Sequence, residues 1–249
     1  MSMAAGSDRT LDVGRVLQDG LGVLSQNFAT FAILGLVLEG IPAAAVAYTN
    51  LLDKTNPVIG LLGVPLVLLN LVTGSILQGA LIYGAMRGLE GRPVSVGDCL
   101  TAGRKRWLSM LGLLISVGLL GALGFVFLIV PGVLLALRWS VAAPALVMEG
   151  YGISDAMHRS AVLTRNRRWS IFLLLLIYLG VIIVLGVVAS VLEGGFKALP
   201  VHPAAAIVLT PLANIINSLI LTTVSTALFR QLRGDQDGAA PDQLAEVFA

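Results

Sequence analysis

Six long runs of apolar residues, separated by short polar segments, dominate the hydrophobic pattern of this chain. A run of about 20 apolar residues, coiled as an α-helix, is long enough to cross a hydrocarbon core of about 30 Å. The runs therefore predict six transmembrane helices, at about 28–50, 58–85, 108–130, 133–148, 170–192 and 204–228. An even number of crossings places both termini on the same side of the membrane.

A shorter segment with apolar residues on one helical face precedes each pair of runs. These segments lie at about 10–26, 95–105 and 153–165, and each carries an early Asp. Such segments are typical of amphipathic helices in the membrane interface. Ser95, with Asp98 three residues later, is a predicted N-cap, and Ser154 is the predicted N-cap of the third segment. The expected fold class is all-α: a polytopic membrane helical bundle of about six transmembrane helices in three hairpins, each preceded by a cytoplasmic amphipathic helix.

Composition supports one membrane domain, at about 1–230, followed by a flexible cytoplasmic tail at 231–249. Hydrophobic residues make up 57% of the chain and charged residues 12%, whereas soluble domains carry about 25% charged residues. The tail mixes acidic residues with Gly and Pro, a composition typical of disorder. Cys99 is the only cysteine, which excludes an intramolecular disulfide and a cysteine metal cage. We expect no cofactor.

The distribution of cations predicts the orientation. Thirteen Lys and Arg residues lie in the termini and loops of one side, and only Lys54 and Lys197 lie on the other. Cytoplasmic loops carry an excess of cations, so both termini and the loops at 86–107 and 149–169 are predicted to be cytoplasmic. Arg outnumbers Lys thirteen to three, a bias that we associate with GC-rich bacterial genomes. The expected location is a bacterial inner membrane.

Basic residues beside the apolar runs are candidates for binding lipid headgroups, and each can contribute about 1 kcal/mol near an anionic surface. They are Arg104, Lys105, Arg106, Arg165, Arg167 and Arg168. A net charge of +2 is too small to indicate nucleic acid. The expected partners are membrane lipids of anionic type, together with a possible membrane-protein partner.

Ionisable residues inside the apolar runs are candidates for function. An Arg at membrane depth costs at least about 2.5 kcal/mol unless it pairs or reaches the interface, so Arg138 is predicted to bind a carboxylate. Glu39, midway along the first run and just before Pro42, is one candidate partner, and Glu193 at the outer end of the fifth run is the other. A paired Glu39 would stabilise the bundle, whereas a free one could couple to protons.

Polar residues recur at helical spacing in the second and sixth runs, notably Asn70 and Gln78 in one and Asn214 and Asn217 in the other. At that spacing much of each set shares a face. Such faces either join helices through hydrogen bonds or line a wet cavity.

No polar loop separates the third and fourth runs. Pro131 and Gly132 therefore predict a tight hairpin turn, and a discontinuous helix that lines a substrate site is the alternative.

One stretch carries a family resemblance. It contains Val130-Pro131-Gly132, Arg138, Ala143-Pro144, Val147-Met148-Glu149-Gly150, Ala156, Arg159-Ser160, Leu163-Thr164 and Trp169. It resembles the membrane domain attached to some glycerophosphodiester phosphodiesterases and the related YciC-like inner-membrane proteins. The resemblance implies a helical membrane domain. In the phosphodiesterases catalysis belongs to a separate soluble barrel, for which this chain has no room, so the activity is not carried over.

Enzyme signatures such as a phosphate-binding glycine loop, His-Glu-x-x-His and Gly-x-Ser-x-Gly are missing. The first hypothesis is therefore a non-enzymatic inner-membrane protein that organises lipid or docks a partner through its bundle and basic interfacial helices. One alternative is a transporter or channel that uses Glu39 and Arg138. The other is the membrane module of a lipid-processing enzyme complex. Water around Glu39 would favour the transporter, and a dry core the first hypothesis.

Overall fold

The computed structural model describes residues 11–52, 57–127, 129–192 and 205–237, and the regular structure in this part of the chain is entirely helical. Six helical stretches in it are long and apolar enough to cross a membrane. They are Phe28–Thr49, Gly63–Leu89, Val96–Val126, Val130–Glu149, Arg168–Val188 and Ile207–Gln236. At most 39% of the apolar window in any of these stretches is buried, so large apolar surfaces face outward. The all-α fold class and the number of long apolar helices are confirmed.

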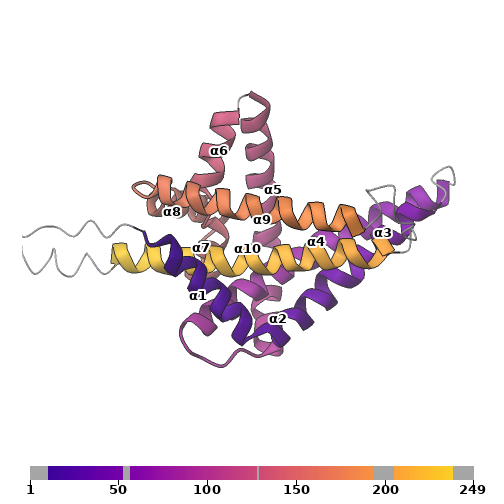
Figure 1. Ribbon diagram of the computed structural model, residues 1–249, viewed down its shortest axis with the longest axis horizontal. Helices are drawn as coiled ribbons and strands as arrows, with labels where there is room; N and C mark the ends of the chain where they lie inside the picture. The colour runs from indigo at the N-terminus through magenta and orange to yellow at the C-terminus, as the bar shows by residue number, and fades with distance from the viewer. Residues whose placement is uncertain (1–10, 53–56, 128, 193–204, 238–249) are drawn as a thin grey trace, which may run out of the picture.

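Eleven helical elements follow one another along the described residues: α1 (Val13–Gln26), α2 (Phe28–Gly35), the π-helical turn η1 (Leu36–Gly40), α3 (Ile41–Leu51), α4 (Pro57–Leu89), α5 (Val96–Phe127), α6 (Ile129–Arg138), α7 (Ala142–Glu149), α8 (Ile153–Leu163), α9 (Arg168–Leu192) and α10 (Ala205–Asp237). Helices α9 and α10 run side by side along the long axis of the molecule, as Figure 1 shows. The hairpin of α5 and α6 stands steeply across that direction (Figure 1), so the long helices are not all parallel.

The first amphipathic segment forms a separate helix, α1, as predicted. Its N-cap is Asp12, whose carboxylate accepts a hydrogen bond from the amide of Arg15 at 3.0 Å. Val16, Gly20 and Val23 on this helix are buried, and its main packing partner is α10. At Gly20 an added Cβ would lie 3.0 Å from the Cα of Val224, so the two helices touch backbone to backbone at this point.

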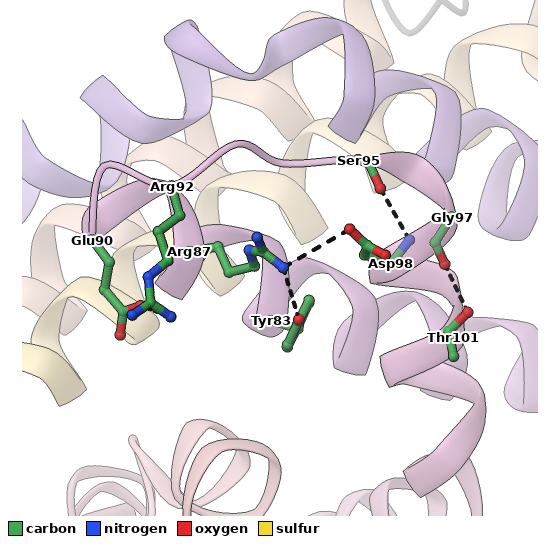
Figure 2. Close-up of polar contacts among 8 residues, drawn as sticks. All are labelled: Tyr83, Arg87, Glu90, Arg92, Ser95, Gly97, Asp98 and Thr101. Atoms are coloured by element: carbon green, nitrogen blue, oxygen red, sulfur yellow. Dashed lines mark hydrogen bonds and ion pairs between the residues drawn. The ribbon is translucent and has the colours of Figure 1, made fainter.

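The second amphipathic segment is not a separate helix, which corrects the prediction for 95–105. It forms the first turns of α5, because no glycine–proline pair interrupts the helix before the apolar run begins. The predicted cap is confirmed, since the hydroxyl of Ser95 accepts a hydrogen bond from the amide of Asp98 at 3.2 Å. Figure 2 shows that the Asp98 carboxylate points toward the guanidinium of Arg87, 3.8 Å away. The same guanidinium donates a hydrogen bond to the Tyr83 hydroxyl.

Two glycines bring α4 and α5 into backbone contact. A Cβ added at Gly79 would lie 3.2 Å from the Cα of Gly103. A Cβ added at Gly103 would collide with the carbonyl oxygen of Ile76 and lie 3.0 Å from the amide nitrogen of Ala80. A methyl group therefore has no room at Gly103.

Pro131 and Gly132, the residues predicted to form a hairpin turn, lie within helix α6. Helix α5 ends at Phe127 and α6 begins at Ile129, so Pro131 lies in the first turn of α6. A proline is tolerated there because the first amides of a helix have no intrahelical acceptor. Gly132 packs against Phe125, whose ring would be 2.6 Å from an added Cβ.

The fourth apolar run is broken, whereas the sequence predicted one helix at 133–148. Helix α6 ends at Arg138 and α7 begins at Ala142. Pro144 has no amide hydrogen with which to bond the carbonyl one turn earlier, which accounts for the interruption.

The third amphipathic segment, α8, covers this break. The Ser160 hydroxyl donates to the carbonyl of Arg138 at 2.8 Å and accepts from the amide of Val141 at 3.3 Å. Ala156, Ser160 and Leu163 are buried, so the inner face of α8 packs on protein and not on lipid. Its N-cap is Gly152 rather than Ser154, which is exposed.

The last helix continues past the predicted start of the flexible tail. Helix α10 extends to Asp237, seven residues into the segment expected to be disordered from residue 231. Ion pairs with the rest of the protein, described below, stabilise this extension. The remainder of the predicted tail, 238–249, lies outside the described residues.

Candidate functional site

An apolar groove of about 340 Å³ lies between α1, α6, α9 and α10. It is lined by Leu17, Leu21, Ala136, Leu137, Ser140, Ile171, Leu174, Leu175, Ile177, Tyr178, Val181, Ile220, Leu221, Val224, Ser225 and Leu228. Three of these side chains carry a hydroxyl and the others are hydrocarbon, so the groove is suited to an apolar occupant. Leu21 and Leu221 are exposed, so the groove is open to the surroundings of the protein.

The length of the groove matches one leaflet of a bilayer. Its lining on α9 runs from Ile171 to Val181. At about 1.5 Å of rise per residue this stretch is about 15 Å long. That is half of a hydrocarbon core about 30 Å thick.

Each of the four helices that line the groove carries one exposed arginine within a turn of a lining residue. They are Arg15 on α1, Arg138 on α6, Arg168 on α9 and Arg230 on α10. Leu137, Ile171 and Leu228, which are close to three of these arginines in sequence, belong to one buried cluster together with Val16, the neighbour of Arg15. The backbones of the four arginines therefore lie near the same end of the groove, and we call these residues the arginine rim.

The predicted headgroup-binding residues divide into two groups. Arg104, Lys105, Arg165 and Arg168 are exposed, and Trp169, which follows Arg168 in the sequence, is 84% exposed. The other two contact protein. Arg106 donates to the carbonyl of Leu146 at 3.3 Å, and Arg167 pairs with Asp235 at 3.3 Å.

A carboxylate that the sequence analysis did not single out pairs with arginines of two other helices. Glu149, the last residue of α7, lies 3.1 Å and 3.3 Å from two guanidinium nitrogens of Arg159 on α8. It also lies 3.7 Å from Arg233 on α10. The Glu149 side chain is only 10% exposed. The one sequence feature that could have drawn attention to Glu149 is that it lies in the stretch that carries the family resemblance.

The predicted pairing of Arg138 with Glu39 is wrong. Oε1 of Glu39 accepts a hydrogen bond from Ser218 at 3.0 Å. Arg138 is the last residue of α6 and its side chain is exposed, because the helix ends there instead of continuing through the apolar run. Its other predicted partner, Glu193, lies outside the described residues.

The remaining intramembrane polar candidates come together in two cavities. Glu39, Gln78 and Asn217 line one, and Asn70 and Asn214 line the other. The polar faces predicted for the second and sixth runs therefore meet across α4 and α10. In the part of the chain that the structure describes, no group of three or more His, Cys, Asp or Glu residues could hold a metal ion.

These observations define an all-helical protein with six helices long and apolar enough to cross a membrane, an apolar groove and a basic end. A family described as a domain of unknown function, DUF7847, is similar to residues 113–232. The match begins within α5 and extends into α10, so it contains α6 to α9 but neither α1 nor Glu39. No curated protein and no solved structure matches the chain. The resemblance to phosphodiesterase membrane domains stays a prediction.

Proposed function

We propose that this chain is a non-enzymatic, multi-pass protein of a bacterial inner membrane that binds an anionic phospholipid. One acyl chain occupies the groove between α1, α6, α9 and α10, and the phosphate contacts the arginine rim. The observation that carries this proposal is the combination of a hydrocarbon-lined groove with four exposed arginines at one end.

Charge and polarity both favour this ligand over a soluble one. The acyl chain of a phospholipid matches the apolar groove, and its anionic headgroup matches the arginine rim. Burial of apolar surface contributes about 25 cal/mol per Å². Each juxtamembrane cation adds about 1 kcal/mol when the lipid is anionic. Arg104, Lys105 and Arg165 would enrich the same lipids around the rim without belonging to the groove.

Neutralising the rim should reduce selectivity for anionic lipid. In the double variant Arg138→Gln/Arg168→Gln, the loss of about 2 kcal/mol of attraction weakens binding of an anionic phospholipid about thirtyfold. Native mass spectrometry of the protein in mild detergent, titrated with phosphatidylglycerol and with phosphatidylcholine, measures both affinities. Affinity for the zwitterionic lipid should change little.

Filling the groove gives an independent readout. Ser225→Phe puts a ring into the groove and should displace both lipids, whereas Leu212→Phe, on an exposed position of the same helix outside the lining, should displace neither. Arg92→Gln is the matched charge control, because Arg92 is exposed, pairs with Glu90 and does not line the groove. Unchanged lipid binding in both the rim and the groove variants would contradict the proposal.

The orientation that accompanies this function follows from the thirteen-to-two distribution of cations. In a Cys99→Ser background, single cysteines at Lys54 and Lys197 should react with an impermeant maleimide added to whole spheroplasts. Cysteines at Ser95 and Ser154 should react only after the membrane is opened. Labelling of Ser95→Cys or Ser154→Cys from outside would reverse the topology.

A further inference from the structure

Glu39 lies at a distortion of its helix. The turn η1, Leu36–Gly40, is π-helical and interrupts the stretch between α2 and α3. Pro42 follows two residues after this turn and cannot donate a backbone hydrogen bond. Single π-helical turns inside α-helices are frequent at functional sites because they re-aim side chains and release carbonyls.

The two oxygens of the Glu39 carboxylate have different surroundings. Oε1 accepts the hydrogen bond from Ser218, at 3.0 Å. Oε2 is buried and has no hydrogen-bond partner among the residues that the structure describes. A buried carboxylate oxygen without a donor is costly, so a proton or another cation at Oε2 would be strongly favoured.

Space for such a cation exists beside the carboxylate. A cavity of about 220 Å³ is bordered by Glu39, Gln78, Asn217, Ser218 and Thr222, together with apolar residues of α4, α5 and α10. Its volume exceeds that of several water molecules, each of which takes about 30 Å³ of liquid volume. Amide and hydroxyl oxygens with one carboxylate form the hard oxygen donor set that alkali and other hard cations prefer.

A second cavity, of about 230 Å³, lies farther along the same helices. Its polar lining is Asn70 on α4 and Thr210 and Asn214 on α10. Asn214 is one helical turn from Ser218, so polar groups follow one face of α10 from one cavity to the next. This arrangement gives the carboxylate polar neighbours in the direction of the α10 N-terminus.

From this geometry we infer that Glu39, with Ser218, Thr222, Gln78 and Asn217, forms an intramembrane binding site for one small cation, either a proton or a sodium-sized ion. The site shares Leu221 with the lining of the lipid groove but none of its polar residues, so it does not depend on the proposed lipid function. Glu39 supplies the negative charge, and the hydroxyls and amides supply neutral oxygens.

Titration of this site involves few groups. Glu39 is the only ionisable side chain in the lining of its cavity. One further ionisable group, the Tyr178 hydroxyl of α9, donates a hydrogen bond to the lining residue Asn217 at 2.9 Å. No cation faces the cavity from the elements that line it. A change in the protonation of this site can therefore be assigned to Glu39.

Two measurements on the full chain in nanodiscs distinguish the two cations. For a proton, infrared difference spectra between acidic and alkaline buffer contain a protonated carboxyl band that disappears in Glu39→Gln. For sodium, the melting temperature at alkaline pH rises with NaCl but not with choline chloride, and this rise disappears in Glu39→Gln. Either result supports the site and names its cation.

Glu90→Gln is the matched control, because Glu90 is exposed and pairs with Arg92 outside the membrane helices. It should leave both signals unchanged. Should Glu39→Gln fail to fold, Ser218→Ala keeps the carboxylate and removes its one donor, so it should shift the carboxyl band or reduce the sodium response. A wild-type protein with neither a titrating carboxyl band nor a sodium-specific response, or with signals that survive Glu39→Gln, would overturn the inference.

Discussion

Gly103→Ala should separate α4 from α5 and lower the stability of the whole helical domain by about 3 kcal/mol, the upper part of the range for overpacking. The added methyl group meets backbone atoms of Ile76 and Ala80 in α4, which cannot move aside as a side chain could. The clash between the new methyl group and the α4 backbone can therefore be removed only if one of the two helices shifts as a whole. Thermal melting in nanodiscs, followed by circular dichroism or tryptophan fluorescence, measures the loss.

Gly118→Ala is the matched control for this experiment. Gly118 lies on the same helix, α5, and an added Cβ there has no neighbour within 4 Å. Because Ala is favoured over Gly in a helix by up to about 1 kcal/mol, this variant should be as stable as the wild type or more stable. If Gly103→Ala melts like Gly118→Ala, then the close approach of α4 and α5 is wrong.

Glu149→Gln should lower the free energy of unfolding by about 2 kcal/mol. The substitution keeps the size of the side chain but removes the charge that faces Arg159 and Arg233. Removing one partner of a fully buried ion pair costs about 3–5 kcal/mol. The value here is smaller because Arg233 is 47% exposed and solvent screens its charge. Thermal melting and limited proteolysis at the α7–α8 junction report the effect.

A double-mutant cycle tests whether the ion pair itself accounts for this loss. Glu149→Gln and Arg159→Gln should be non-additive, with a coupling of about 1 kcal/mol or more. Glu90→Gln is the surface comparison, and its pair with Arg92 should contribute about 0.5 kcal/mol or less. Strictly additive losses at Glu149 and Arg159 would show that the two residues act separately.

The long helices and one cap were predictable because they depend on local chemistry. An apolar run of some twenty residues is helical in lipid wherever it occurs, since every backbone group must bond within its own segment. Ser95 could be recognised as a cap from its spacing to Asp98 alone, and its bond to that amide is present. The polar faces of α4 and α10 were readable from three- and four-residue spacing.

Tertiary contacts decided the features that the sequence did not reveal. The break between α6 and α7 was not predicted, because the hydroxyls of Ser160 and Thr164, which bond its polar groups, come from a later part of the chain. Arg138 was expected at membrane depth because the fourth run was counted as one helix, and the end of α6 leaves its side chain exposed. Glu149 was not singled out from the sequence, because its partner Arg233 lies 84 residues further along the chain.

The ion pairs of Glu149 also bear on how the chain can be assembled during its synthesis. Translation delivers Arg159 ten residues after Glu149, so the nascent chain already contains a guanidinium when α7 and α8 first meet. Arg233 belongs to α10 and arrives only when the last of the long apolar helices has been synthesised. The carboxylate thus has a counterion as soon as α8 has been synthesised, and α10 later adds a second one that ties the end of the chain to α7.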